Sequence, residues 1–331
     1  MKKIVILLIC LVLSFSAISF SGCTAKEKVV IYTSTEDYII DLLNSKFAEQ
    51  FPDYEIKVEY MSTSNIAAKV ISEGAQSDCD IIFAEEYGYI AKMMDADAIS
   101  NLKDMYDYSV FTDESLNFEA KDYLLPSLKT GGAVVVNNYV LSQNGLSKPT
   151  SYADLLAPGF DNLVSMPSPK SSGTGYMFYL SLVNAMGEQN ALTYFDSLSE
   201  NVLSFTSSGS GPINALVQRD VAVGFGMISQ AVDKISSGVS ELEIVVFEEG
   251  APFNLYGNCI VKGKEERTAV KEVMDYLYSD FTDLCCSTFC PESVLKNKTY
   301  EVENYPSNIV YANMEGNTLD KKEELLEKWT H

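Results

Sequence analysis

Two short segments rich in serine and glycine have the residue types that bind anions. They are SSGTG at residues 171–175 and SSGSG at residues 207–211. Each follows a predicted strand and precedes a predicted helix, so backbone N–H groups and hydroxyls would gather where the helix dipole is positive. Glycine also lets a ligand approach the backbone closely. Two such helix starts facing one cleft would form a cradle for an anion.

Serine and glycine also favour ordinary helix caps and turns, and for one segment alone capping is the simpler interpretation. The two segments together favour anion recognition. The residues that we expect to contact the ligand here are Ser172, Gly173 and Thr174, and Ser208, Gly209 and Ser210.

The sequence lacks the groups that several common kinds of catalysis need. Its only histidine is His331, the last residue, so a folded domain has no histidine base, histidine-containing triad or histidine metal site. No G-x-S-x-G nucleophile elbow occurs. We therefore expect no catalytic residues, although serine, tyrosine and carboxylate groups leave a secreted hydrolase as an alternative. The net charge of −22 disfavours a nucleic-acid partner, which needs clustered lysine and arginine.

The N-terminus has the pattern of an export signal. Lys2 and Lys3 precede an apolar stretch from Ile4 to Phe20, and the sequence FSGC ends at Cys23. Small residues before a cysteine are typical of a bacterial lipoprotein signal. We expect a signal peptide over residues 1–22, a lipid on Cys23 and a polar tether over 23–27. The lipid would hold the protein at the extracellular face of the cytoplasmic membrane or facing a periplasm. An uncleaved membrane anchor is the alternative.

Five of the seven cysteines lie beyond this signal. They are Cys79, Cys259, Cys285, Cys286 and Cys290. Without histidine partners or paired C-x-x-C motifs, a zinc site is disfavoured and no metal site is predicted. Buried free thiols are the simpler expectation, and a disulfide within the last three stays open.

Apolar stretches alternate with helix patterns along the chain, which is typical of a parallel sheet covered by helices. Strands are predicted near residues 28–32, 54–60, 79–83, 131–138, 162–166, 202–206, 221–225, 243–247 and 257–261. Helices are predicted between them, followed by an amphipathic helix over 265–289 and an exposed charged helix over 319–329. The predicted fold class is α/β, with two lobes, a hinge and a cleft. The first lobe would comprise residues 28–134 and 252–331, and the second 135–251.

The order of these elements resembles the type 2 periplasmic-binding-protein fold, in the branch of ABC-importer proteins that bind ferric iron, phosphonates and sugar phosphates. The resemblance covers residues 28–331. Its motifs are IYTS at 31–34, DIIFAE at 80–85, TSYADLLAP at 150–158, MPSP with SGTG at 166–175, and SGSGP with VAVGF at 208–225. It implies a monomeric, non-enzymatic protein without a cofactor that captures a small solute and passes it to permease and ATPase subunits. A binding module that serves a sensor kinase has the same sequence features.

A phosphonate or phosphate ester is the first expectation for the ligand, and ferric iron is the alternative. Iron binders of the family place adjacent tyrosines after the strand that matches 221–225, where this sequence has GMIS. Further residues expected at the ligand lie at strand ends, which face the crevice in an open parallel sheet; they are Tyr32, Ser34, Thr35 and Ser64, joined by Met227 and Tyr256. Glu85 or Glu86 could accept an amine or hydroxyl of the ligand.

Overall fold

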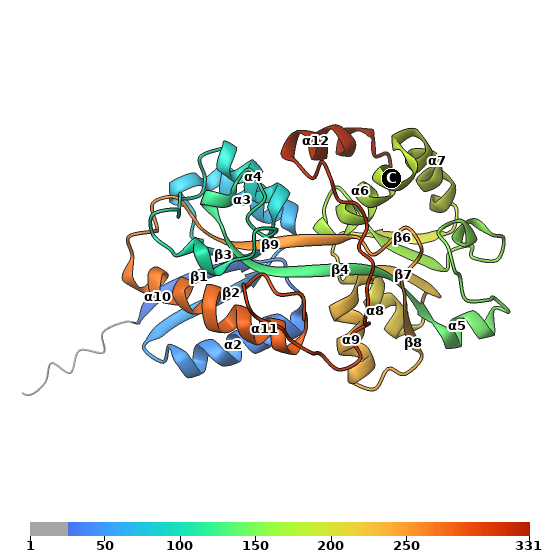
Figure 1. Ribbon diagram of the computed structural model, residues 1–331, viewed down its shortest axis with the longest axis horizontal. Coiled ribbons are helices and arrows are strands. Elements are labelled where there is room, and N and C mark those ends of the chain that lie inside the picture. The colour runs from blue at the N-terminus through green and yellow to red at the C-terminus, as the bar shows by residue number, and fades with distance from the viewer. Residues whose placement is uncertain (1–25) are drawn as a thin grey trace, which may run out of the picture.

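The computed structural model describes residues 26–331, shown in Figure 1. The predicted signal peptide and the cysteine expected to carry a lipid lie outside the described residues. Within this range, nine strands form one sheet in the order β2-β1-β3-β9-β4-β7-β5-β6, with β8 beside β4. Their bounds are β1 Glu27–Thr33, β2 Tyr54–Tyr60, β3 Ile81–Glu86, β4 Leu125–Asn137, β5 Val164–Pro167, β6 Val202–Thr206, β7 Val223–Met227, β8 Leu242–Val245 and β9 Phe253–Ile260.

The first lobe is built on β1, β2 and β3, which run parallel. Helices cover both faces, which explains why β1 and β3 are nearly continuous apolar runs. On one face Val29 and Ile31 pack with α2 and α10, and on the other Val30 packs with α3. The helices of this lobe are α2 Asp37–Gln50, α3 Thr63–Glu73, α4 Tyr87–Asp95, α10 Thr268–Tyr276 and α11 Thr282–Thr288.

The second lobe is built on β5 to β8. Strand β5 lies parallel between β6 and β7, while β7 and β8 pair antiparallel with β4. Its helices are α5 Asn138–Gln143, α6 Gly173–Met186, α7 Glu188–Ser199, α8 Gly211–Gln218 and α9 Ile228–Ser236. The largest core of the molecule lies here, around the aromatic side chains of Tyr176, Phe178 and Phe225.

Two long strands connect the lobes, as the band across the centre of Figure 1 shows. Strand β9 pairs with β3 of the first lobe, and β4 pairs with β7 and β8 of the second. The two strands pair with each other between these regions, from Leu125–Asn258 to Gly131–Phe253. The predicted fold class, two α/β lobes joined by a hinge, is therefore confirmed. The residue boundaries of the lobes remain a prediction.

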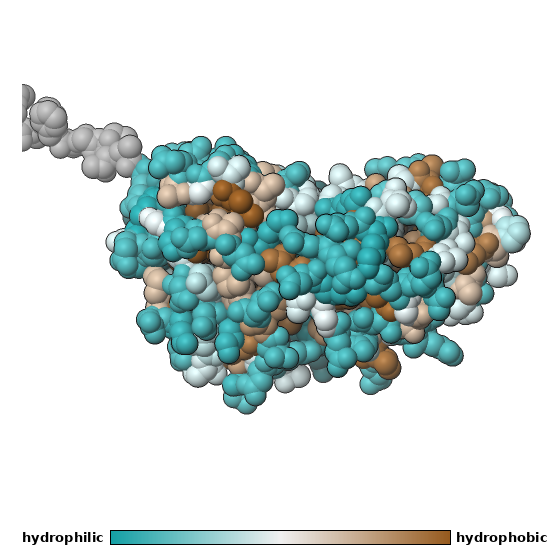
Figure 2. All heavy atoms as spheres, turned by 90° about the horizontal axis from the view of Figure 1, so that it is seen from above, coloured by the Kyte–Doolittle hydropathy of each residue, from teal (hydrophilic) through white to brown (hydrophobic). Residues whose placement is uncertain are grey.

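The C-terminal segment contacts both lobes. Helix α12, Leu319–Lys328, forms where a helix is expected, but one side of it is buried rather than exposed. Lys322 lies against Glu86 in the first lobe, and Trp329 packs against Tyr179 and Phe195 in the second. Seen from the side of α12, the surface is mostly hydrophilic, with hydrophobic residues singly or in small groups (Figure 2).

Two further observations concern the described residues. The five cysteines are buried and free, as expected for thiols that pack in a core. Among residues 26–331, no helix is both long and apolar enough to span a membrane.

Candidate ligand-binding site

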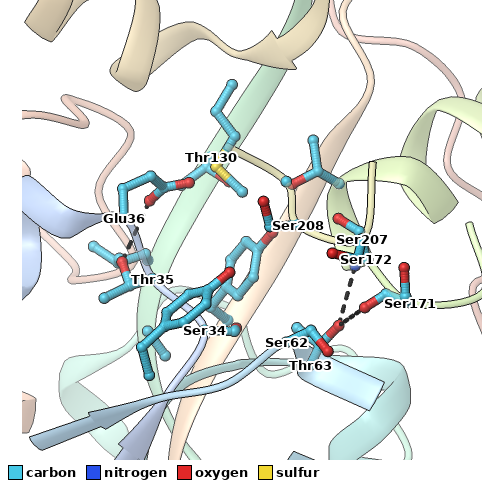
Figure 3. A pocket seen from close by; sticks show the side chains of 18 residues that line it. Ser34, Thr35, Glu36, Ser62, Thr63, Thr130, Ser171, Ser172, Ser207 and Ser208 are labelled. Carbon is cyan, nitrogen blue, oxygen red and sulfur yellow. Dashed lines mark hydrogen bonds between the residues drawn. The ribbon is translucent and has the colours of Figure 1, made fainter. Parts of the chain in front are cut away.

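A narrow cavity lies between the lobes (Figure 3); the space between its walls, including the part open to solvent, is about 460 Å³. The ends of β1, β2 and β3 and the start of α3 border it from the first lobe, β4 and β9 from the hinge, and two loops and the end of β7 from the second lobe. Its lining residues are Ser34, Thr35, Glu36, Tyr60, Ser62, Thr63, Ala84, Leu128, Thr130, Ser171, Ser172, Gly173, Thr174, Ser207, Ser208, Gly209, Met227 and Tyr256. Most of these side chains end in a hydroxyl, so the wall offers many neutral hydrogen-bond donors and acceptors.

The structure brings together most of the residues expected at the ligand. The cavity is lined by Ser34, Thr35, Ser172, Gly173, Thr174, Ser208, Gly209, Met227 and Tyr256. They come from both lobes and from sequence positions far apart. The rule that strand ends meet at one edge of a parallel sheet explains why they converge.

Three of the expected residues do not line the cavity. Tyr32 is only 2% exposed and packs in the first-lobe core, because the alternation along β1 turns its side chain toward α3. The hydroxyl of Ser64 donates to the carbonyl of Ser171, at 3.4 Å. Ser210 is not a lining residue, although its hydroxyl lies 3.3 Å from that of the lining residue Ser208.

Glu85 and Glu86 also lie away from the cavity. Both are fully buried, and Glu86 forms an ion pair with Lys322 of α12. Burial raises the pKa of Glu85 well above its ordinary value, and the neighbouring charge of Glu86 adds to the shift. Neither carboxyl is placed to accept an amine or hydroxyl of a ligand in this cavity.

The two serine- and glycine-rich loops meet face to face at the cavity. A Cβ atom added to Gly209 would lie 2.4 Å from the hydroxyl oxygen of Thr174 and 3.3 Å from that of Ser172. Any side chain at position 209 would therefore push the loops apart. Ser172 caps α6, since its hydroxyl accepts from the N–H of Gly175 at 3.4 Å. The hydroxyls of both loops and the start of α6 thus border one small space.

A first-lobe residue reaches across to these loops. The hydroxyl of Thr63 accepts from the N–H of Gly173 and donates to the carbonyl of Ser171, both at 3.2 Å (Figure 3). Asn254 of the hinge donates to the carbonyl of Gly173 at 2.8 Å. The lobes are therefore closed on each other. The N–H of Gly173, at the start of α6, was expected to donate to a ligand, but it already donates to Thr63.

Glu36 was missed by the sequence analysis, although it directly follows two residues expected at the site. Its side chain is 8% exposed and accepts a hydrogen bond from the hydroxyl of Thr35, at 3.4 Å. Burial raises its pKa from 4.5 to about 7, an effect reduced by hydrogen bonds from its own backbone N–H and from Thr35. Among the lining residues in the described chain, it is the one with an ionisable carboxyl, and none is lysine or arginine.

The rule that the ends of parallel strands face the cleft predicts only some of the further wall residues. Tyr60 ends β2 and, at 46% exposed, stands at the mouth of the cavity. Thr130 lies in the middle of β4, is 4% exposed, and its hydroxyl has no hydrogen-bond partner among the described residues. Its neighbour Lys129 points to the opposite face of the strand, toward Glu114 at 3.0 Å. A residue in mid-strand carries no local signal that it borders a cleft.

The described residues contain no cluster of three or more histidine, cysteine, aspartate or glutamate side chains able to hold a metal ion. The cavity therefore offers a hydroxyl-rich surface with a single carboxyl. This arrangement suits a small polar solute.

Comparisons with known proteins agree with this geometry. A family model described as bacterial extracellular solute-binding protein matches residues 81–309. An uncharacterized protein of Haemophilus influenzae is 24% identical over 326 residues, which cover 95% of this chain and 93% of that protein.

Solved structures show the same fold. The periplasmic binding protein AfuA from Actinobacillus pleuropneumoniae, solved with fructose 6-phosphate, is 21% identical, with a TM-score of 0.79 over 92% of this chain and 98% of that one. Apo ferric ion-binding protein A of Pasteurella haemolytica is 14% identical, with a TM-score of 0.70 over 91% of this chain and 96% of that one. At these identities the likeness shows the fold, which is the two-lobed type 2 periplasmic-binding-protein fold that the motifs predicted.

Proposed function

Since this chain belongs to the family of bacterial extracellular solute-binding proteins, we propose that it captures a small organic anion bearing a phosphonate or phosphate-ester group. The solute lies in the interlobe cavity and is passed to the permease and ATPase subunits of an ABC importer. The protein acts as a monomer and catalyses no reaction. A lipid on Cys23 holds it outside the cytoplasmic membrane.

The observation that carries the proposal is the meeting of the two serine- and glycine-rich loops. The hydroxyls of Ser172, Thr174 and Ser208 border one space beside the start of α6. Hydroxyl and amide donors at a helix start favour a phosphoryl group without a lysine or arginine. AfuA, with the same fold, was solved with a sugar phosphate, which agrees with this ligand class.

Ferric iron fits the cavity less well. Tyr60 and Tyr256 are the tyrosines in the wall, and they come from different strands rather than from an adjacent pair. Burial raises the pKa of both phenols, which opposes the phenolates that a ferric ion needs. With Glu36 they would offer few ligands to a bare ion.

A thermal-shift screen tests the ligand class. It would compare fructose 6-phosphate, alkyl phosphonates, thiamine, polyamines and Fe³⁺ on the purified protein. A ligand at 100 times its Kd adds about 2.7 kcal/mol to the free energy of unfolding, which raises the melting temperature by several degrees. Stabilisation by cations or Fe³⁺ alone would refute the proposed anion. Inorganic phosphate released from phosphate esters would instead favour a hydrolase.

A double substitution tests the site. Thr174→Ala with Ser208→Ala removes two hydroxyls from the loops and should weaken binding of the stabilising anion by about tenfold or more. Thr193→Ala is the matched control, because this exposed hydroxyl lies on α7, outside the cavity wall. Equal affinities of the two variants would place the site elsewhere.

The anchor is tested separately. Cys23→Ala should release the protein into the medium or the periplasm, whereas the unchanged chain stays with the membrane fraction. A variant that remains membrane-bound would show that the lipid is not the anchor.

A further inference from the structure

A second hollow, the rear groove, lies behind the hinge. The space between its walls, including the part open to solvent, is about 1420 Å³. Side chains along β9 alternate between the two faces of the sheet, so Tyr256 borders the interlobe cavity while Phe253 and Leu255 line the rear groove. The cavity and the rear groove therefore lie on opposite faces of the hinge.

The walls of the rear groove belong to different lobes. One wall is the loop of residues 114–121, part of which packs against the first-lobe core. The other wall is the C-terminal segment 312–318, which follows the part of the chain that crosses β4 and β9 on its way to α12 (Figure 1). Asn184 of the second-lobe helix α6 donates to the carbonyls of Asn313 and Glu315, at 2.9 and 3.0 Å. The width of the groove therefore depends on how the two lobes are placed.

Aromatic rings line the rear groove. Phe118 packs against Tyr87, with ring centroids 5.0 Å apart, and Phe253 comes from β9. The rings of Phe118 and Phe253 remain partly exposed. Phe253 already contacts an ammonium, since Lys129 Nζ lies 4.5 Å from its ring centroid. The faces of aromatic rings attract cations in this way, so a molecule with an apolar body and a positive charge fits this lining.

Carboxylates outnumber ammonium groups around the rear groove. Glu114, Glu119 and Glu315 line it, and Lys121 is the one cationic lining residue in the part of the chain that the structure describes. Glu114 is already paired with Lys129, at 3.0 Å. Among the ion pairs of the described residues, none includes Glu119 or Glu315. Both carboxylates are therefore free to meet a cation from solution.

A neutral acceptor indicates the same kind of ligand. The side-chain oxygen of Asn317 lines the groove, is shielded from solvent and has no hydrogen-bond donor among the described residues. A buried acceptor without a donor costs free energy, which a ligand that brings N–H groups would recover. Carboxylates, an amide oxygen and aromatic faces all favour a donor that carries a positive charge.

We propose that the rear groove is a second binding site, for a small organic cation with an apolar body, and that its occupant holds the lobes closed. The cationic group pairs with the carboxylates of Glu119 and Glu315, and the apolar part covers Phe118 and Phe253. A rotation that opens the interlobe cavity narrows a groove on the opposite face of the hinge, so a filled groove resists opening. The two sites are coupled although they share no lining residue, whatever solute the cavity binds.

Three matched compounds test the binding by ligand-observed NMR titration of the purified protein: phenethylamine, phenethyl alcohol and phenylacetate. They carry different charges on a common aromatic body. The amine should bind about tenfold more tightly than the alcohol, and phenylacetate most weakly, because partly exposed ion pairs and a cation–π contact each contribute modestly. Glu119→Gln with Glu315→Gln should remove the preference for the amine. Glu301→Gln with Glu303→Gln, two exposed carboxylates outside the groove, should keep it.

Hydrogen exchange measures the effect on the lobes. The N–H of Gly173 donates to Thr63 across the boundary between the lobes, at 3.2 Å, so it exchanges with solvent when the lobes separate. Phenethylamine at ten times its Kd should slow this exchange by about tenfold, because a ligand that binds only the closed form stabilises that form by this factor. The N–H of Val30, which donates to Asp80 within the first lobe at 2.9 Å, is the control and should keep its exchange rate.

Each result decides a separate step. If the three compounds fail to bind or bind within about threefold of one another, or if the variant lacking both carboxylates keeps the preference for the amine, the rear groove is not a cation site. If the amine binds and the exchange of Gly173 is unchanged or faster, the coupling to the lobes is wrong. Loss of amine binding in the variant with Thr174→Ala and Ser208→Ala would place the amine in the interlobe cavity and overturn the inference. Binding of phosphonates and sugar phosphates is measured without the amine, so the proposed function stands or fails separately.

Discussion

Lys322 offers the sharpest test of how the C-terminal helix holds the two lobes together. The residue is 2% exposed and forms an ion pair with the fully buried Glu86. Its ammonium also lies 3.9 Å from the ring centroid of Tyr89 and 4.3 Å from that of Tyr176. Glu86 and Tyr89 belong to the first lobe and Tyr176 to the second, so one ammonium contacts both lobes from a third element.

Lys322→Met keeps most of the apolar side chain and removes the charge. The carboxylate of Glu86 would then remain buried, with the N–H of Gly88, at 3.0 Å, as its remaining hydrogen-bond donor. Removing one partner of a buried ion pair costs about 3–5 kcal/mol, because the other charge is left unbalanced. We expect the free energy of unfolding to fall by that amount. Adding Glu86→Gln should recover much of the loss, since the buried charge is then gone as well.

Urea denaturation of the purified protein measures these differences. Lys321→Met is the matched control on the neighbouring residue, whose ammonium forms partly exposed ion pairs with Glu188 and Glu324 at 3.2 Å. Its loss should cost about 1 kcal/mol or less. If Lys322→Met and Lys321→Met destabilise the protein equally, the buried pair contributes nothing beyond a surface contact and the reasoning is wrong.

Three further predictions follow from other contacts. Trp329→Ala should lower the free energy of unfolding by about 3–5 kcal/mol in the same assay, because the indole is 1% exposed against aromatic rings of the second lobe; an unchanged midpoint would show that the tail does not stabilise the core. In the unliganded protein, the raised pKa of Glu36 means that the folded state binds more protons than the unfolded state between pH 4.5 and 7. Stability contributed by this group is therefore lost as pH rises through that range, by at most about 3 kcal/mol, and Glu36→Gln should flatten the melting-temperature profile there. Gly209→Ala should cost about 1–3 kcal/mol and weaken anion binding, because the new Cβ would overlap the hydroxyl of Thr174; unchanged affinity in calorimetry would show that the loops separate freely.

The sequence predicts the parts of the site that local rules describe. Loops that join a strand to a helix have recognisable serine and glycine patterns, so the segments around Thr174 and Gly209 are placed correctly at the cavity. The ends of parallel strands gather at one edge, which places Ser34 there too. Tyr32 does not line the cavity, because side chains along β1 alternate between the two faces of the sheet. The side chain of Tyr32 lies in the core beside α3.

Features that depend on the closing of the lobes could not be predicted. The contact of Thr63 with the N–H of Gly173 joins residues of different lobes, and no local pattern encodes it. The buried side of α12 could be predicted in part from the sequence, because Leu319, Lys322 and Leu325 recur at helical spacing. A lysine among these residues would normally indicate a side of the helix that faces solvent. Only the ion pair with Glu86 explains why Lys322 is buried.

The position of α12 also bears on the rate at which a solute exchanges. The cavity lies between closed lobes, so a solute enters or leaves only when they separate. Each separation must disrupt contacts that Lys322 makes with both sides, as well as the hydrogen bond from Tyr89 to the carbonyl of Lys170, at 3.3 Å. We therefore expect association to be limited by how often the lobes part rather than by diffusion, with a rate constant that levels off at high solute concentration. Weakening α12 would then speed both uptake and release while leaving the cavity wall untouched, so exchange kinetics and selectivity are governed by separate parts of the chain.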